Sequence, residues 1–281
     1  MGLNRVGLPA EVANVIIAKT QTESAVAKLA RKITIPGRGL AVPVITGDPQ
    51  ASWVGEGAQK PVSNAEVTSK LLQPYKLAVI ETFSKELARD QKALYDALVE
   101  RLPKALAQKF DNTVINGAAP GANFDTFAAA TAQSIANGEY DALVGADGDV
   151  ANNGGVLNGF ILSPQGKSAF LGAKDTLGRP IFTMSATQGL GGQLIGADTV
   201  ISKGAYKAVA GGNDILGVGG DFSQAVVGTV NDVEISVSDE ATLTLPDGST
   251  VNLFQNNMIA VLAEIEIGFR ADVASFDLIT A

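Results

Sequence analysis

Residues 84–117 read SKELARDQKALYDALVERLPKALAQKFDNTVING and carry the most regular helical pattern in the chain. Apolar side chains recur at every fourth position, which places one apolar stripe along a helix: Leu94, Leu98, Leu102, Leu106, Phe110 and Val114. Ser84 can cap the leading turn, Pro103 should kink the helix, and Asn116-Gly117 should end it. At ~1.5 Å of rise per residue the helix would be ~50 Å long, which is typical of a structural spine and long for a compact enzyme.

Two extended segments precede this helix. Leu40–Thr46 is a short strand whose Pro43 suits a sheet edge, and 70–83 is a longer extended run. The polar stretch between them predicts a long hairpin, and residues 1–36 predict an arm with a weak helical pattern at 24–32. A two-stranded hairpin is only marginally stable alone in water, so we expect it to rest on another surface, such as a neighbouring subunit.

The chain after the helix alternates short apolar runs with glycines and closes in a long strand. Residues 118–254 predict an α+β domain with a hairpin turn at 245–249. The apolar runs in it are Phe160–Ser163, Thr199–Ser202 and Ala225–Val230. From Ile259 to Phe269 apolar residues alternate, which predicts a strand with one apolar face. The opposite face would carry the charged residues Glu264, Glu266 and Arg270.

Two further patterns suggest ligands weakly and are better interpreted as loops. The glycine-rich stretches 189–192 and 211–220 lack the Lys-Ser/Thr ending of a phosphate loop. Asp147 and Asp149 lack the remaining ligands of a calcium-binding loop. We therefore expect flexible or solvated loops at these places, with neither a metal nor a cofactor.

Composition narrows the chemistry further. The 281 residues include no Cys and no His, which excludes thiol nucleophiles, Ser–His triads and the usual zinc sites. The net charge is −8 and no dense basic run is present, so we expect no sequence-specific DNA binding. Hydrophobic residues make up 46% and charged residues only 18%, which favours an obligate oligomer. The apolar runs all fall short of the ~20 residues that span a bilayer.

Laid end to end, these features resemble the major capsid proteins of tailed bacteriophages with the Hong Kong-97-type fold, over nearly the whole chain. The motifs that carry the resemblance are ASWVGEGA at 51–58, KPVS at 60–63, LQPYKLA at 72–78, FSKEL at 83–87, ING at 115–117, FILSP at 160–164, LGRP at 177–180, GQLIG at 192–196, and the closing segment that runs from NM at 257–258 to FR at 269–270. The resemblance implies an α+β fold in four parts. These are an N-terminal arm at 1–36, an extended β-hairpin loop at 37–72, a peripheral domain with a long spine helix at 73–130 and 255–281, and an axial domain at 131–254.

The resemblance also implies a structural subunit and not an enzyme. It implies hexamers and pentamers that close an icosahedral shell around double-stranded DNA, which makes the virion the final location. Assembly would take place in the bacterial host cytoplasm, which suits a chain without disulfides. Residues 1–36 alone precede the hairpin, so we expect a separate scaffolding protein rather than a fused one. A portal is a further expected partner, and a decoration protein an optional one.

Some members of that family join their subunits by isopeptide bonds. A lysine on the extended loop attacks an asparagine of a neighbour, and a glutamate of a further subunit takes up protons. The resemblance assigns these roles to Lys60, Asn257 and Glu264. Members that do not cross-link carry the same residue types near these places, where Lys and Glu would form a reversible ion pair worth little if exposed. The sequence leaves both interpretations open.

Two other classes of protein compete with this interpretation. An encapsulin, a bacterial nanocompartment shell of the same fold, would close small shells alone around an enzyme cargo. The 53–63 loop resembles the phage form more closely. A carboxylate-based enzyme such as a glycosidase would need two carboxylates ~5–10 Å apart in a cleft. The absence of His and the 6% aromatic content argue against such a sugar-binding cleft.

Overall fold

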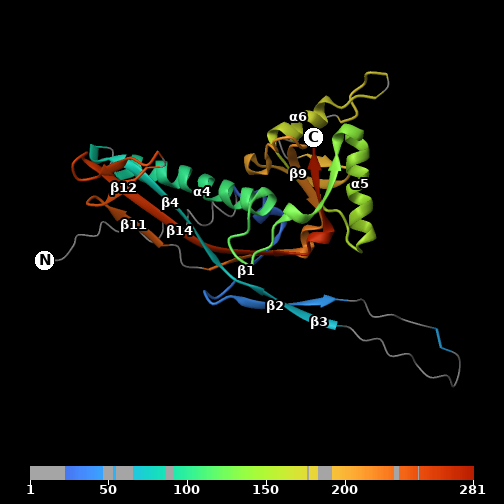
Figure 1. The fold of residues 1–281 in the computed structure, drawn as a ribbon, viewed down its shortest axis with the longest axis horizontal. Coiled ribbons are helices and arrows are strands. Elements are labelled where there is room, and N and C mark those ends of the chain that lie inside the picture. The colour runs from blue at the N-terminus through green and yellow to red at the C-terminus, as the bar shows by residue number, and fades with distance from the viewer. Residues whose placement is uncertain are drawn as a thin grey trace.

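The spine predicted from the sequence is the longest helix that the computed structural model describes, α4 at Gln91–Asn116. It lies along strand β14 (Met258–Ala271) in an elongated molecule, with a second sheet at the far end and a hairpin that projects from the middle (Figure 1). The structure describes residues 23–46, 53–54, 66–86, 91–175, 177–182, 192–230, 234–245 and 247–281.

The predicted apolar stripe of α4 is confirmed, and it packs on the first sheet. Its buried members are Leu98, Leu102, Leu106, Phe110 and Val114. The helix runs through Pro103 and ends at Asn116, where the Gly117 N–H donates to the Thr113 carbonyl at 3.1 Å. Ser84 is the last residue of β4 (Tyr75–Ser84), and 85–86 directly after it are helical. Because 87–90 lie outside the described residues, the N-cap at Ser84 stays a prediction.

β14 is the central strand of the first sheet. β4 pairs with one edge of it antiparallel over ten residue pairs, while β10 (Ala225–Thr229) and β11 (Glu234–Ser238) pair with the other edge end to end. β1 (Arg31–Thr34) joins β10 in parallel. The alternation predicted for β14 is confirmed by the buried residues Ile259, Val261, Ala263, Ile265, Ile267 and Phe269. This apolar face is the one that α4 covers.

The second sheet has six strands. Their order is β5 (Thr131–Ser134), β15 (Phe276–Thr280), β9 (Ile215–Gly220), β6 (Gly159–Leu162), β8 (Ala197–Ile201) and β7 (Gln193–Leu194). β5 and β15 are parallel, as are β6 and β8. Helices α5 (Glu139–Asn152) and α6 (Pro164–Gly172) pack on it through Leu143 and Phe170, against Phe160.

Two loop predictions in this region are wrong. The stretch 211–220 contains β9, whose glycines leave the space that the Phe160 and Phe276 rings of the neighbouring strands occupy. A strand with so little intrinsic strand propensity is held by its place between two apolar strands. Asp147 and Asp149 lie in helix α5 and not in a solvated loop.

The remaining elements are short. A small hairpin joins β12 (Thr242–Thr244) and β13 (Thr250–Asn252), and its turn at 245–249 confirms the predicted one. Helix α2 (Ala25–Leu29) lies in the arm. Short 3-10 helices are Phe127–Ala129, Ile135–Asn137, Lys203–Ala205, Phe222–Gln224 and Val273–Ser275.

Strand pairing within the two sheets does not follow the domain limits expected from the sequence. β10 and β11 come from 131–254 but pair with β14 of the first sheet. β15 comes from 255–281 but pairs with β5 and β9 of the second sheet. A local pattern predicts a strand but not its pairing partner, which depends on the whole sheet. The residue limits of the domains therefore remain a proposal, and the strand pairing does not follow them.

Aromatic rings join the two sheets beneath α4. Phe269 of β14 lies 5.5 Å from Phe127 and 6.1 Å from Phe124, measured between ring centroids. Phe127 in turn lies 4.3 Å from Phe276 of β15. These rings are almost completely buried, and such edge-to-face and tilted pairs add to the stabilisation from apolar burial. The two sheets therefore share one apolar cluster where they meet and are not two independent units.

Candidate assembly and cross-linking site

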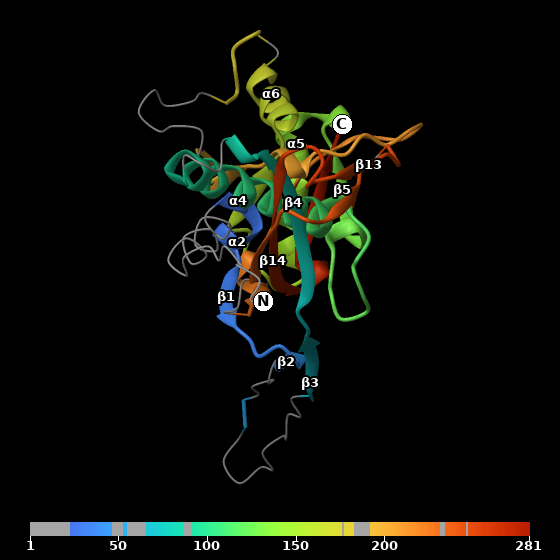
Figure 2. The same ribbon diagram turned by 90° about the vertical axis from the view of Figure 1, so that its left-hand side faces the viewer.

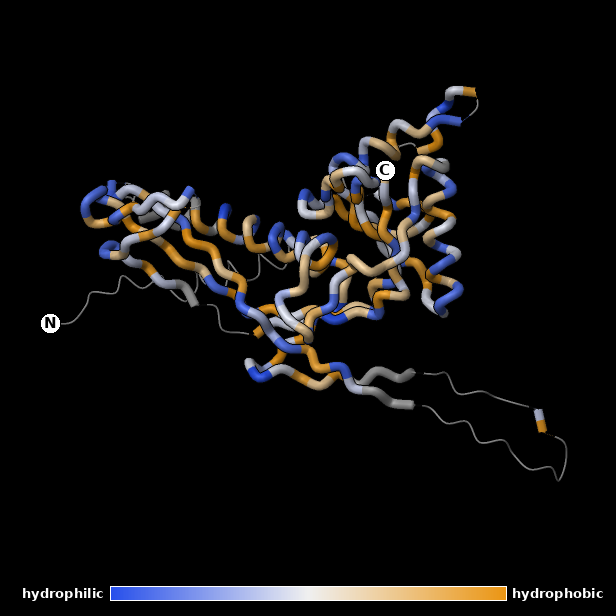
Figure 3. The backbone as a smooth tube through the Cα atoms, in the orientation of Figure 1, coloured by the Kyte–Doolittle hydropathy of each residue, from blue (hydrophilic) through white to orange (hydrophobic). Residues whose placement is uncertain are grey.

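The two sheets and the helices packed on them form the body of the molecule. The β2–β3 hairpin projects away from this body in both ribbon views (Figures 1 and 2). β2 (Leu40–Thr46) and β3 (Glu66–Leu72) pair antiparallel from Leu40 opposite Leu72 to Thr46 opposite Glu66. Both strands carry apolar residues close to the body (Figure 3), and Leu40 and Leu71 are exposed. Beyond the paired strands Trp53 has a relative exposure of 105%. Exposed apolar side chains on a projecting hairpin indicate that the hairpin contacts another protein surface.

The root of the hairpin rests on two facing glycines. Leu72 is fully buried, and it packs with Ile35 and Val226. Gly228 of β10 lies opposite Gly268 of β14. A methyl group at Gly228 would come within 2.7 Å of the Leu72 side chain, and one at Gly268 would come within 2.5 Å of the Gln73 carbonyl. Only glycine therefore lets the chain cross the sheet so closely.

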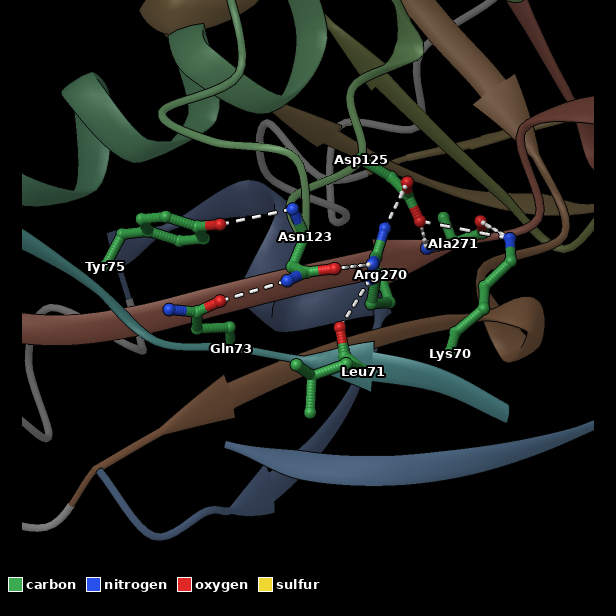
Figure 4. A network of polar contacts seen from close by, with 8 residues as sticks. All are labelled: Lys70, Leu71, Gln73, Tyr75, Asn123, Asp125, Arg270 and Ala271. Atoms are coloured by element: carbon green, nitrogen blue, oxygen red, sulfur yellow. Dashed lines mark hydrogen bonds and ion pairs between the residues drawn. The ribbon is translucent and has the colours of Figure 1, made fainter. Parts of the chain in front are cut away.

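Beside these glycines lies a group of polar contacts that we call the root cluster (Figure 4). Its members are Lys70, Leu71, Gln73, Tyr75, Asn123, Asp125, Arg270 and Ala271. The guanidinium of Arg270 donates from Nε to the Leu71 carbonyl at 2.9 Å, from Nη1 to Asp125 Oδ1 at 2.8 Å, and from Nη2 to Asn123 Oδ1 at 2.9 Å. One planar cation thus connects β14, β3 and the loop that follows α4.

The other contacts of the root cluster hold β3 to the same loop. Asp125 Oδ2 accepts the Ala271 N–H at 3.1 Å and lies 4.0 Å from Lys70 Nζ. Lys70 Nζ also donates to the Ala271 carbonyl at 3.2 Å. Asn123 Nδ2 donates to Gln73 Oε1 at 3.0 Å. The hairpin root is therefore fixed by charged and neutral hydrogen bonds as well as by the burial of Leu72.

Asn257 lies in an exposed turn at the start of β14, at the opposite end of that strand from the root cluster. Its φ is +51°, in the left-handed region that Asn tolerates better than most residues. Its carbonyl accepts the Lys85 N–H at 2.9 Å. Its side-chain amide has no hydrogen bond to any residue that the structure describes. The amide is thus open to a group from another subunit.

Glu264 lies on the face of the first sheet that α4 does not cover. Its carboxylate is 3.5 Å from Lys76 Nζ, in an ion pair that is largely exposed on the lysine side. Seven residues of strand separate it from Asn257, which is ~23 Å at the usual rise. The two side chains therefore do not meet within one chain. Lys60 lies outside the described residues.

Asp111 of α4 fastens the arm to the spine. The carboxylate is buried and accepts from Ser24 Oγ at 2.6 Å, Ala25 N at 2.9 Å, Val26 N at 3.2 Å and Ser202 Oγ at 2.8 Å. It satisfies the first N–H groups of α2, which have no partner within that helix. Burial raises the pKa of Asp111, and the hydrogen bond from Ser24 opposes that shift most strongly.

A second buried carboxylate lies in the second sheet. Asp277 of β15 is 1% exposed, and Gln133 Nε2 donates to Asp149 at 2.8 Å and to Asp277 at 3.3 Å. Burial raises the pKa of Asp277 to about 7, and the charge of Asp149 adds to the shift while the hydrogen bond from Gln133 opposes it. Asp277 therefore changes its charge close to neutral pH.

The described residues hold no group of three or more Asp or Glu side chains placed to bind a metal ion. None of the described helices is both long and apolar enough to cross a membrane.

Sequence reasoning missed the root cluster and the buried carboxylates. Arg270 was expected on the polar face of the closing strand, but its partner Asp125 is 145 positions away. No local pattern links residues so far apart. For Asp277 a signal existed, because it is the one carboxylate in the apolar run Phe276–Ile279. A lone acid in a buried strand indicates a specific partner.

Comparison with known proteins adds independent findings. The profile of the phage capsid family matches residues 4–277. A protein of Mycobacterium phage L5 named "Probable major capsid protein gp17" is 33% identical, over 94% of this chain and 86% of the relative. Its namesake in Mycobacterium phage D29 is 28% identical, over 95% of this chain and 87% of the relative.

Solved structures show the same fold. A chain from Gordonia phage Cozz superposes with a TM-score of 0.69 at 24% identity, covering 92% of this chain and 86% of that one. A chain from Mycobacterium phage Ogopogo gives a TM-score of 0.71 at 18% identity, covering 92% and 91%.

Proposed function

The chain belongs to the phage capsid family, and we propose on that premise that its copies form hexamers and pentamers that close an icosahedral shell around double-stranded DNA. It is the major capsid protein of a tailed phage, a structural component of the virion shell and not an enzyme. The observation that supports this assembly is the projecting hairpin. Its exposed Trp53, Leu40 and Leu71 need a surface that another subunit would supply.

The proposal extends to the partners of assembly. A separate scaffolding protein, a portal and an optional decoration protein would act with this chain in the cytoplasm of a bacterial host. DNA would be enclosed without sequence-specific binding, which the net charge of −8 supports because like charges repel. The alternative of an encapsulin is not favoured, because the curated relatives are named as phage capsid proteins.

Native mass spectrometry of the purified chain tests the hexamer and pentamer proposal. We expect species of five and six subunits to dominate when shells are dissociated under mild conditions. A chain that remains monomeric or dimeric at every concentration would contradict the proposal.

The proposal includes a covalent step between subunits. Lys60 Nζ on one hairpin attacks Asn257 Cγ of a neighbour, an amide C–N bond forms, and the side-chain nitrogen leaves as ammonia. Glu264 of a further subunit accepts the proton of the attacking amine and returns it to the leaving nitrogen. The open amide of Asn257 supports this role, as does the accessible face on which Glu264 lies. A reversible ion pair between Lys60 and Glu264 is the competing outcome.

A denaturing gel of boiled, mature particles decides between the covalent and reversible forms. Covalent joining predicts a ladder of multimers from the wild type. Lys60→Arg keeps the positive charge but removes the nucleophile, and Asn257→Asp keeps the shape and tolerates the same φ but removes the amide leaving group. Both variants should give a single band. A single band from the wild type would exclude the covalent step and leave the shell proposal intact.

A further inference from the structure

The hairpin joins the body through two short segments. One is the turn before β2, in which the Gly39 N–H donates to the Pro36 carbonyl at 2.8 Å and Gly39 has a φ of +86°. The other is the end of β3, where Leu72 is buried between Gly228 and Gly268. An apolar contact of this kind holds the root in place without fixing an angle, because apolar burial has little directional preference.

At the β3 end of the junction, the root cluster supplies directional hydrogen bonds beside this apolar contact. The planar guanidinium of Arg270 donates to a backbone carbonyl of β3 and to two side chains of the loop after α4 (Figure 4). Asn123 holds its own place through its N–H, which donates to the Tyr75 hydroxyl at 3.1 Å. A planar guanidinium group that makes three hydrogen bonds restricts rotation of the hairpin root, whereas a single point charge does not.

Burial distinguishes this ion pair from the others of the body. The Arg270 side chain is 13% exposed and Asp125 is 20% exposed, at 2.8 Å. The Arg101–Glu81 pair is equally short at 2.7 Å, but its arginine is 66% exposed. Exposed pairs are screened by water and contribute little, while partly buried, hydrogen-bonded pairs contribute more.

We propose that Arg270 is the positioning residue that sets the direction in which the hairpin leaves the body, and so the neighbouring surface that it reaches. This inference rests on the proposed function, in which the hairpin contacts another subunit. The paired part of β3 extends ~20 Å from Leu72, so a small rotation at the root moves the far end of the strand by a much larger distance. A tilt of ~10° at the root would displace its far end by ~3.5 Å, which is enough to lose van der Waals contact with a partner.

Spin-label distance measurements on the unassembled subunit test the positioning role directly. The chain contains no Cys, so Glu66→Cys at the outer end of β3 and Lys109→Cys on α4 give two unique labelling sites. Arg270→Ala should broaden the distance distribution several-fold relative to the parent. Arg101→Ala, which removes the exposed arginine of the same body, is the matched control and should leave the distribution unchanged.

Arg270→Lys separates geometry from charge. This variant keeps the positive charge but loses the planar guanidinium group. A broad distance distribution is therefore expected for it too. If Arg270→Ala does not fold, Arg270→Lys alone tests the positioning role. A distribution as narrow as that of Arg101→Ala in both Arg270 variants would overturn the assignment.

The second readout is the fraction of closed shells of uniform diameter in electron micrographs. We expect it to fall several-fold in both Arg270 variants and to remain at the parental level in Arg101→Ala. A broadened hairpin with unchanged shells would overturn the link to assembly. If the parent forms no hexamers, pentamers or shells under any condition, the proposed function fails, while the distance measurements still decide whether Arg270 positions the hairpin.

Discussion

The body and the hairpin of this subunit are stabilised in opposite ways. In the body, Phe269 and Phe127 are fully buried among other rings, so the chain supplies both sides of every core contact. In the hairpin, Leu40 and Leu71 are exposed, and Trp53 is fully open to solvent. The contrast agrees with the proposed role of the hairpin in assembly, and the predictions below separate folding of the body from assembly through the hairpin.

The largest expected effect is on the body. Phe269→Ala removes a ring that contacts Phe110, Phe124 and Phe127, and it should lower the free energy of unfolding by ~3–5 kcal/mol. Urea unfolding of the unassembled subunit measures this. Ile80→Ala on the uncovered face of the same sheet is the control, because Ile80 is half exposed and should cost well under ~1.5 kcal/mol. Equal losses of unfolding free energy in the two variants would show that the aromatic cluster around Phe269 is not part of the stabilising core.

The second effect depends on pH. The folded protein keeps a proton on Asp277 up to a pH of about 7, whereas the unfolded chain releases it near 3.8. Between these values the folded state binds more protons, so this group makes stability fall as pH rises through the window. Asp277→Asn should therefore match the wild type near pH 4 and exceed it at pH 8, by at most ~4 kcal/mol.

Thermal unfolding of both proteins across that pH range measures the difference. Asp247→Asn is the control with the opposite sign, because hydrogen bonds from Ser249 lower the pKa of Asp247, so its charge is favoured in the fold. That variant should lose a little stability above pH 4. A wild type whose stability advantage over Asp277→Asn grows with pH would contradict the assignment.

The smallest effect on stability is expected at the hairpin. Trp53→Ala should change the free energy of unfolding of the isolated subunit by less than ~0.5 kcal/mol, because Trp53 is fully exposed. The same change should reduce the yield of shells, since a tryptophan that becomes buried on binding commonly dominates an interface. Trp53 is also the only tryptophan of the chain, so its emission should shift to shorter wavelength when shells form. Unchanged emission on assembly would mean that Trp53 stays in water.

Periodic segments of the fold could be predicted from the sequence, and segments defined by distant contacts could not. The every-fourth pattern through Leu98 and Leu102 predicted α4, and the alternation from Ile259 predicted β14, because each burial pattern repeats locally. β9 was missed because its glycines give no strand signal by themselves. Their purpose appears only against the Phe160 and Phe276 rings that they accommodate.

The candidate site divides in the same way. The resemblance gave positions to Asn257 and Glu264, and the structure shows Glu264 on β14 and Asn257 in the turn directly before that strand. It could not indicate the partnership of Arg270 with Asp125, or that of Asp277 with Asp149. Each pair joins a strand of one of the sheets to a loop or helix far away in the sequence, and only the completed fold brings the two together.

The measurement that tests the central claim most directly is a cryo-electron microscopy reconstruction of particles assembled from this chain. The account predicts closed icosahedral shells in which each hairpin lies on a neighbouring subunit, with Trp53 covered by it. Particles in which the hairpins point into solvent, or a preparation that stays monomeric under every assembly condition, would contradict it.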